Sequence, residues 1–132
     1  MKSVLFVCVE NSNRSQMAEA FARMHGAGRV EAASAGSKPS GRVNPKAVEA
    51  MRERGYDLAA HVSKGLEEFN GRHVDVAVTM GCGDECPLVH AGQRVDWQIP
   101  DPRDMTPEQF RGVRDLIERK VVELLASLES AS

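Results

Sequence analysis

One stretch near the N-terminus combines residue types that could attack an anion. Cys8 follows the apolar run Val4-Leu5-Phe6-Val7, and Arg14 and Ser15 come six and seven residues later, where a helix-like pattern begins. Backbone N–H groups of such a loop would point at a tetrahedral anion, and the Arg14 guanidinium could bind two of its oxygens. The same positive field favours the ionised sulfur of Cys8. The stretch therefore predicts a thiolate nucleophile within an oxyanion site formed by Glu10, Asn11, Ser12, Asn13, Arg14 and Ser15.

A carboxylate far along the chain has a restricted backbone. Asp101 stands between Pro100 and Pro102, and each proline fixes its own φ and limits the residue before it. Such a carboxyl suits a general acid that protonates the oxygen leaving when Cys8 attacks. The alternative is an ordinary turn aspartate.

Two further cysteines, Cys82 and Cys86, lie on a glycine-rich segment. Their spacing and setting indicate a redox pair, while the alternatives are small buried residues or metal ligands, for which only His90 lies nearby. The histidines show no paired spacing and are not expected to act in catalysis; they are His25, His61, His73 and His90.

The elements that must position these residues alternate between strands and helices. Apolar runs predict strands at 3–7, 30–35, 74–79 and 95–99. Helices are expected from 15 to the glycines at 26 and 28, from 45 to 55, from Ser63 through 66 and 69, and from 107 onward, with 129–132 frayed. An extended piece should contain Asp57 and Leu58.

This alternation predicts an α/β fold with a parallel sheet covered by helices on both faces. Ligands of such sheets bind beyond the carboxyl ends of the strands. Cys8, Cys82 and Asp101 each follow an expected strand, so we expect them to converge at one edge of the sheet.

Composition narrows the function classes. At 132 residues the chain fits one domain, 1–132, and a net charge of −2 gives no basic field for nucleic acid. There is no apolar run of membrane-spanning length and no cleavable signal pattern, so we expect a cytoplasmic protein. Three cysteines without zinc-type histidine spacing argue against a disulfide framework and a structural zinc site.

These motifs carry a family resemblance. Cys8-x5-Arg14-Ser15 together with Asp101-Pro102 resembles the low-molecular-weight protein tyrosine phosphatase superfamily, and the added Cys82 and Cys86 resemble its arsenate reductase branch. The resemblance implies a four-stranded parallel sheet of order 2-1-3-4. It also implies Cys8 as nucleophile, Arg14 as oxyanion clamp and Ser15 as a hydroxyl that stabilises the thiolate. Asn11 would hold the shape of the loop, and Asp101 would be the acid.

The implied reaction is reduction of arsenate to arsenite through a Cys8 thiol-arsenate adduct and a disulfide relay from Cys8 to Cys82 to Cys86. Phosphate or sulfate would mimic the substrate, and thioredoxin or glutaredoxin with glutathione would recycle the enzyme. No tightly bound cofactor is implied. In some arsenate reductases of this type a potassium ion lies behind the loop, and the matching residues here are Asn11, Glu19, Ser34 and Asp57.

Two features leave alternatives open. Cys82 and Cys86 are closer together than the corresponding pair of thioredoxin-coupled members, so the reductant is undecided. The phosphatases have an aromatic residue after Asp-Pro, where this chain has Arg103 and Asp104. The main alternative is a phosphatase that hydrolyses phosphomonoesters through a Cys8 phosphocysteine, and another is a non-catalytic anion or redox sensor.

Overall fold

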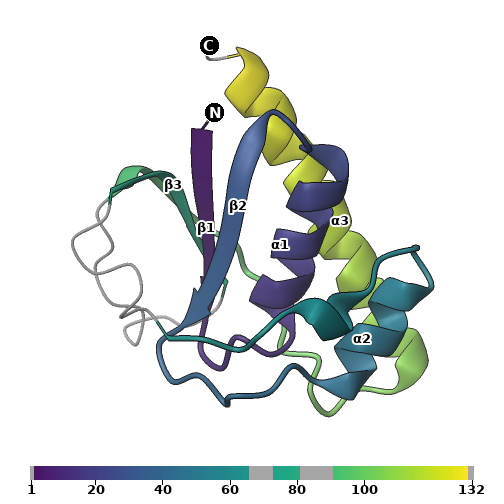
Figure 1. Ribbon diagram of the computed structural model, residues 1–132. Coiled ribbons are helices and arrows are strands. Elements are labelled where there is room, and N and C mark those ends of the chain that lie inside the picture. The colour runs from purple at the N-terminus through teal and green to yellow at the C-terminus, as the bar shows by residue number, and fades with distance from the viewer. Residues whose placement is uncertain (1, 66–72, 81–90, 131–132) are drawn as a thin grey trace.

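Strands and helices alternate along most of the described chain, as expected, and two strands follow one another before the last helix (Figure 1). The computed structural model describes residues 2–65, 73–80 and 91–130. In chain order the elements are β1 (Lys2–Cys8), α1 (Arg14–His25), β2 (Val30–Gly36), α2 (Pro45–Arg52), the 3₁₀ helix η1 (Leu58–Ala60), β3 (Val74–Thr79), β4 (Ala91–Asp96) and α3 (Pro107–Ser130).

The four strands form one parallel sheet in the order β2-β1-β3-β4, which confirms the predicted topology. The register places Cys8 beside Gly36, and Val7 beside Thr79. The carboxyl ends of β1, β2 and β3 therefore meet at one edge of the sheet, and the loop after Cys8 begins at that edge.

Helices α1, α2 and α3 lie on the same side of the sheet in Figure 1. Helix α1 packs against β1, β2 and α3, while α2 packs against α3. Val4 and Phe6 of β1 join this core, whereas Leu5 and Val7 belong to a second cluster that contains no residue of these helices. The predicted helix through 66 and 69 lies outside the described residues, so helical cover of the second face stays a prediction.

The long last helix is confirmed together with its start signal. The backbone N–H of Thr106 donates to Gln109 Oε1 (3.1 Å), and the N–H of Gln109 donates to Thr106 Oγ1 (3.2 Å). This is a reciprocal capping box in which Pro107 takes the first helical position. The apolar residues that recur along this helix at helical spacing are buried; they are Phe110, Val113, Ile117, Val121, Leu124 and Leu128.

The predicted strand at 95–99 has the wrong bounds. Strand β4 begins at Ala91 and ends at Asp96, and Trp97 and Ile99 are buried residues beyond it. The exposed Gly92-Gln93-Arg94 gave no apolar signal, because β4 is an edge strand whose side chains remain partly solvated.

Some smaller features differ from expectation. Leu58 begins η1 rather than lying in an extended piece, because the Asp57 side chain accepts a hydrogen bond from the Ala59 N–H. Helix α3 continues to Ser130, past the start of the expected frayed end at 129. Helix α2 ends at Arg52, and the turn that follows leads to Gly55, whose positive φ fits the predicted stop.

None of the described helices has the length and apolar character of a membrane span.

Candidate active site

Cys8 is the last residue of β1 and is 3% exposed. Residues 9–13 form the loop before α1, so the expected oxyanion residues 10–13 lie in this loop, and Arg14 and Ser15 begin the helix. The side chain of Asn13 lines the pocket without capping α1, and its Oδ1 has no hydrogen-bond partner within the described residues. Cys8 and the N-terminus of α1 therefore flank a short loop that is buried at residues 11–13.

Four carbonyl groups between Cys8 and Ser12 are directed outward, toward the segment that follows β2. A trans peptide holds its N–H and C=O on opposite sides, so outward carbonyls leave N–H groups that face the inside of the loop. The bonds are Ser37 N–H to Cys8 O (3.1 Å), Lys38 N–H to Val9 O (2.8 Å), Ser40 N–H to Glu10 O (3.1 Å) and Asn44 N–H to Ser12 O (3.1 Å).

A glycine at the end of β2 allows this close contact. A Cβ on Gly36 would lie 2.5 Å from Val9 O and 2.9 Å from the Asn11 backbone N. Both distances are below van der Waals contact, so any larger residue would push the loop away from β2.

Ser15 and Asn11 define the surroundings of the sulfur. Cys8 Sγ lies 2.8 Å from Ser15 Oγ, which accepts a hydrogen bond from Asn11 Nδ2 at 2.8 Å. Because Ser15 already accepts from Asn11, its own hydrogen is free to point at the sulfur, where it stabilises a thiolate. Asn11 has a left-handed backbone (φ 52°) and is fully buried, which fits its predicted role in shaping the loop.

A chain of polar side chains continues outward from Ser15. From the surface inward its links are Tyr56 Oη to His61 Nε2 (2.6 Å), His61 Nδ1 to Gln16 Oε1 (2.9 Å), Gln16 Nε2 to Asn11 Oδ1 (2.9 Å) and Asn11 Nδ2 to Ser15 Oγ (2.8 Å). Gln16 Nε2 also contacts the carbonyl oxygens of Asn11 and Val62, so it must be the donor. His61 Nδ1 is therefore the donor to Gln16.

The pKa shifts of His61 and Tyr56 agree with this direction of hydrogen bonding, from Tyr56 through His61 toward Gln16. Burial lowers the pKa of His61 below its ordinary value of 6.5; Glu19 opposes this shift, and Arg23 and Lys64 reinforce it. Burial also raises the pKa of Tyr56. Sequence reasoning missed both Gln16 and His61, because a single glutamine or a scattered histidine carries no spacing signal.

Arg14 and Asp101 meet across the pocket, as the sequence predicted. Arg14 Nη2 lies 3.9 Å from Asp101 Oδ2, and its Nη1 donates to the Ile99 carbonyl at 3.1 Å. The Arg103 N–H donates to Asp101 Oδ1 (3.1 Å), and the Arg103 side chain pairs with Glu10 at 3.2 Å. These contacts hold the carboxyl and the guanidinium over the same loop.

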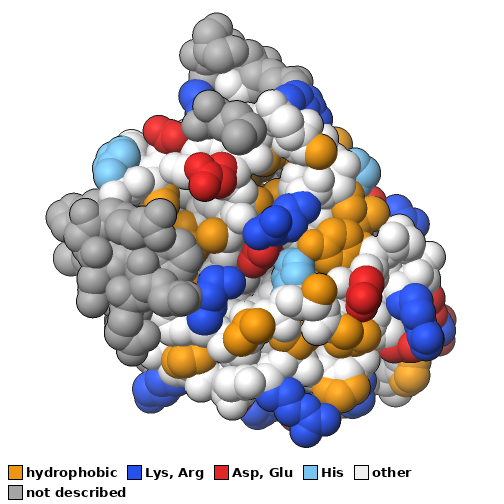
Figure 2. Space-filling view, viewed as in Figure 1, with side chains coloured by type: hydrophobic (Ala, Val, Ile, Leu, Met, Phe, Trp, Pro, Cys, Tyr) orange, Lys and Arg blue, Asp and Glu red, His pale blue; other side chains and the backbone are white. Residues whose placement is uncertain are grey.

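The pocket between them has a volume of about 190 Å³, enough for a small anion. None of the described residues that line it is aromatic; they are Cys8, Val9, Glu10, Ser12, Asn13, Arg14, Asp101 and Arg103. Figure 2 shows basic side chains gathered along the edge at which β1 and β2 end; the segment after β2 carries the exposed Lys38 and Arg42, and the first turn of α2 carries the exposed Lys46. Positive charge there favours the approach of an anion.

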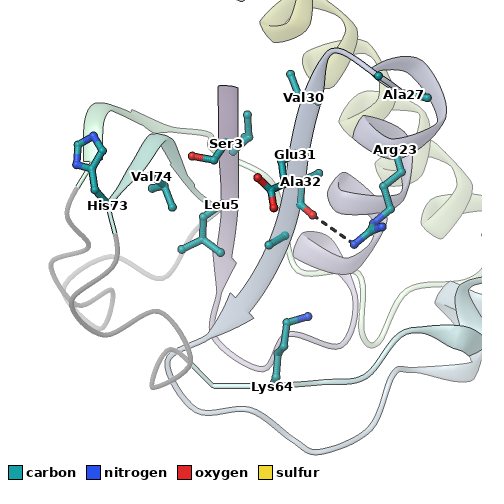
Figure 3. Close-up of a pocket in the computed structure, with 13 residues that line it drawn as sticks. Ser3, Leu5, Arg23, Ala27, Val30, Glu31, Ala32, Lys64, His73 and Val74 are labelled. Atoms are coloured by element: carbon teal, nitrogen blue, oxygen red, sulfur yellow. Dashed lines mark hydrogen bonds between the residues drawn. The ribbon is translucent and has the colours of Figure 1, made fainter. Parts of the chain in front are cut away.

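A larger cavity of about 820 Å³ lies elsewhere (Figure 3). It opens along β2 and the second face of the sheet, with Leu5, Ala33 and Val74 among its lining residues. Neither Cys8 nor Asp101 lines it, so its size does not make it the reaction site.

The four residues matched to potassium do not form one set of ligands. Ser34 Oγ donates to Glu19 Oε1 at 2.6 Å, and both side chains are buried. Asp57 instead accepts from the Ala59 N–H (3.1 Å) at the start of η1. Asn11 Oδ1 already accepts a hydrogen bond from Gln16. This arrangement does not fit a potassium ion, because Asp57 caps η1 and the cations of Arg23 (2.9 Å) and Lys64 (4.0 Å) already lie beside Glu19.

Cys82 and Cys86 lie outside the described residues, so their pairing stays a prediction. Ser63, expected to cap a helix, instead donates to the Glu10 carbonyl (2.9 Å) and accepts from the Gly41 N–H (3.1 Å). Its hydroxyl therefore supports the Cys8 loop.

Three features define the phosphatase-like class of cysteine proteins. A cysteine ends a central strand of a parallel sheet in an α/β fold, an anion-binding loop follows it, and an arginine lies at the start of the next helix. Residues 3–132 match the family model described as low molecular weight phosphotyrosine protein phosphatase, and the chain belongs to that family.

Its relatives include reductases. A glutaredoxin arsenate reductase from Synechocystis sp. is 41% identical over 131 residues, which cover 97% of this chain and 99% of that protein. A solved structure of an arsenate reductase in the phosphate binding state is 42% identical with a TM-score of 0.88, and covers 96% of this chain and 98% of that one. The thioredoxin-dependent arsenate reductase of Corynebacterium glutamicum is 30% identical with a TM-score of 0.82, over 100% of this chain and 64% of that one.

Proposed function

We propose that this protein reduces arsenate to arsenite, with Cys8 as the nucleophile. The observation that carries the proposal is the pocket in which Cys8, Arg14 and Asp101 meet over an anion-binding loop. Full-length similarity to arsenate reductases at 41–42% identity supports arsenate as the oxyanion.

In the first step, the Cys8 thiolate attacks arsenic and a sulfur–arsenic bond forms. An arsenic–oxygen bond breaks, and Asp101 donates a proton so that the oxygen leaves as water. Arg14 and the inward N–H groups bind the remaining oxygens, where charge accumulates during the attack. Ser15 donates to the sulfur before it reacts.

In the second step, the Cys82 thiolate attacks the Cys8 sulfur. The sulfur–arsenic bond breaks and its electron pair stays on arsenic, which leaves as arsenite. Cys86 then attacks Cys82, which frees Cys8 as a thiolate and moves the disulfide to Cys82–Cys86. An external thiol protein supplies two electrons to reduce this disulfide.

The reductant is thioredoxin or glutaredoxin with glutathione, because arsenate reductases of both kinds resemble this chain. The scheme needs three reduced cysteines, and thiols stay reduced in the cytoplasm, where we place the reaction.

A phosphomonoesterase that forms a Cys8 phosphocysteine is the second candidate, since phosphate and arsenate share their shape. The pocket is poorly suited to large aryl phosphate esters, because the described residues that line it offer no aromatic surface for a phenyl ring. Weak phosphatase activity would accompany reduction, because the loop distinguishes the two anions poorly.

An arsenate reduction assay run in parallel with thioredoxin, with glutaredoxin plus glutathione, and with neither tests the proposal. We expect turnover with one thiol system and loss of turnover in Cys82→Ser. Faster hydrolysis of an aryl phosphate than reduction of arsenate would favour the phosphatase instead. Unchanged arsenite production by Cys82→Ser would contradict the disulfide relay.

A further inference from the structure

Behind the Cys8 loop, a buried carboxylate is surrounded by cationic side chains. The Glu19 side chain, on α1, is 3% exposed. Its Oε2 accepts a hydrogen bond from Arg23 Nε at 2.9 Å, and its Oε1 lies 4.0 Å from Lys64 Nζ. Ser34 Oγ donates to Oε1 at 2.6 Å, and His61 Nδ1 lies 3.8 Å from Oε2. Burying a carboxylate is costly without such compensation.

Lys64 joins this cluster to the loop. Its backbone N–H donates to Asn11 Oδ1 at 2.9 Å, and its carbonyl accepts from the Gly36 N–H at 2.9 Å. In Figure 3, Lys64 rises from the segment after η1 toward β2, while Arg23 reaches β2 from α1 and donates to the Ala32 carbonyl at 3.3 Å. One residue therefore places a positive charge near Glu19 and anchors the side chain that positions Ser15.

This arrangement disagrees with the potassium site that the family resemblance implies. The ammonium of Lys64 already lies 4.0 Å from Glu19 Oε1, and Arg23 Nε lies 2.9 Å from Oε2. The positive charges of these two side chains would repel a further cation in the same space.

We propose that Lys64 is a built-in cation of this protein: its ammonium, together with Arg23, neutralises Glu19 in place of a bound potassium ion. The chain should therefore be stable without potassium. Lys64 acts here as a positioning residue, because it contacts Asn11 and Glu19 rather than the substrate.

The test is a thermal melt of the reduced full-length protein in potassium chloride and in choline chloride at equal ionic strength. The wild type and Lys64→Arg, which keeps the charge, should give the same Tm in both salts. Lys64→Gln should lower Tm by about 3–5 °C in choline chloride. Part of that loss should return, saturably, with potassium, because the vacated space beside Glu19 then admits an ion.

A double-mutant cycle with Glu19→Gln identifies the partner of Lys64. The Tm loss caused by Lys64→Gln should largely disappear when Glu19 no longer carries a charge. Lys120→Gln, which removes a lysine on α3 that lies over Trp97, is the matched control and should show no dependence on Glu19.

Two results would overturn the proposal. One is a saturable rise of wild-type Tm with potassium relative to choline, which would mean that an ion binds despite Lys64. The other is equal Tm losses from Lys64→Gln with and without the Glu19 charge. The melts need no arsenate, so a protein that fails to reduce arsenate would refute the proposed reaction and leave this proposal standing.

Discussion

The Ser15 hydroxyl, which lies next to Cys8 Sγ, is oriented by several other side chains. Asn11 occupies the acceptor side of Ser15, and Gln16 and the Lys64 N–H together fix the amide of Asn11. Hydrogen bonds aligned in one direction polarise each other, so the outer members of such a chain influence the inner ones.

We expect Tyr56→Phe and His61→Leu to shift the pH profile of Cys8 alkylation. Without His61 Nδ1–H, Gln16 and Asn11 are less constrained, and the Ser15 hydroxyl can turn away from the sulfur. Alkylation of Cys8 by iodoacetamide near neutral pH should slow by about threefold to tenfold. Peptide-resolved mass spectrometry separates Cys8 from the other cysteines.

Two substitutions control this experiment. His61→Asn keeps an N–H near the place of Nδ1 and should restore most of the rate. His25→Asn removes a histidine that pairs with Glu118 and should have no effect. Equal profiles for folded His61→Leu and wild type would show that the outer residues only support the fold.

Replacing Asp101 by Asn should lower the kcat of arsenate reduction by about 100-fold or more, because the leaving oxygen then departs without its proton donor. Steady-state kinetics with the thiol system in excess measures the effect. Asp104→Asn, an exposed neighbour outside the described lining of the pocket, is the control and should retain full activity. A similar kcat for Asp101→Asn and wild type would mean that another group is the acid.

At the scale of elements, the contact between β2 and the Cys8 loop decides the geometry of the site. Gly36→Ala should destabilise the protein by about 1–3 kcal/mol, because its Cβ would meet the backbone of Val9 and Asn11. It should also slow Cys8 alkylation by displacing the loop. Urea unfolding measures the stability change.

The control for this substitution is Gly112→Ala in the second turn of α3. No described neighbour lies within 4 Å of a Cβ there, so we expect a gain of about 0.5–1 kcal/mol from helix propensity. If Gly36→Ala were as well tolerated as Gly112→Ala, the loop would not depend on close contact with β2.

At the scale of the whole molecule, a charged cluster joins α2 to α3. Glu53 accepts hydrogen bonds from Arg111 (3.0 Å) and Arg114 (2.8 Å), and Arg114 also donates to the Ala50 carbonyl at 3.0 Å. Both hydrogen bonds lower the pKa of Glu53 below its ordinary value of 4.5, and the bond from Arg111 has the larger effect. Helix α2 follows the segment that binds the loop carbonyls, so this contact also supports the site.

A lowered carboxyl pKa gives stability that is present above pH 4.5 and is lost as the pH falls through the folded-state value. We therefore expect Glu53→Gln to lower Tm slightly at pH 7 and to match the wild type at strongly acidic pH. Glu49→Gln, whose ion pair with Arg52 stays within α2, is the control. Thermal melts between pH 7 and pH 3 follow the difference; a difference that is constant with pH would contradict this assignment.

Local sequence determined much of the fold. Apolar runs predicted β1, β2 and β3 to within a residue or two, and the Thr106–Gln109 box marked the start of α3. These signals depend on periodicity and capping, which neighbouring residues define. The edge strand β4 and the short helix η1 were missed, because partial solvation and a single Asp57 cap leave no such pattern.

The sequence alone predicted that Cys8, Arg14 and Ser15 lie together at one site, because their spacing after a strand has few structural uses, and the structure brings them together. What only the tertiary structure decided is how these groups are held. Lys64 contacts Asn11 from a segment that is distant in the chain, and Val62 and His61 hold the Gln16 amide from the same segment. No local pattern encodes such contacts. The same folding placed cationic side chains beside Glu19, where the resemblance had suggested an ion.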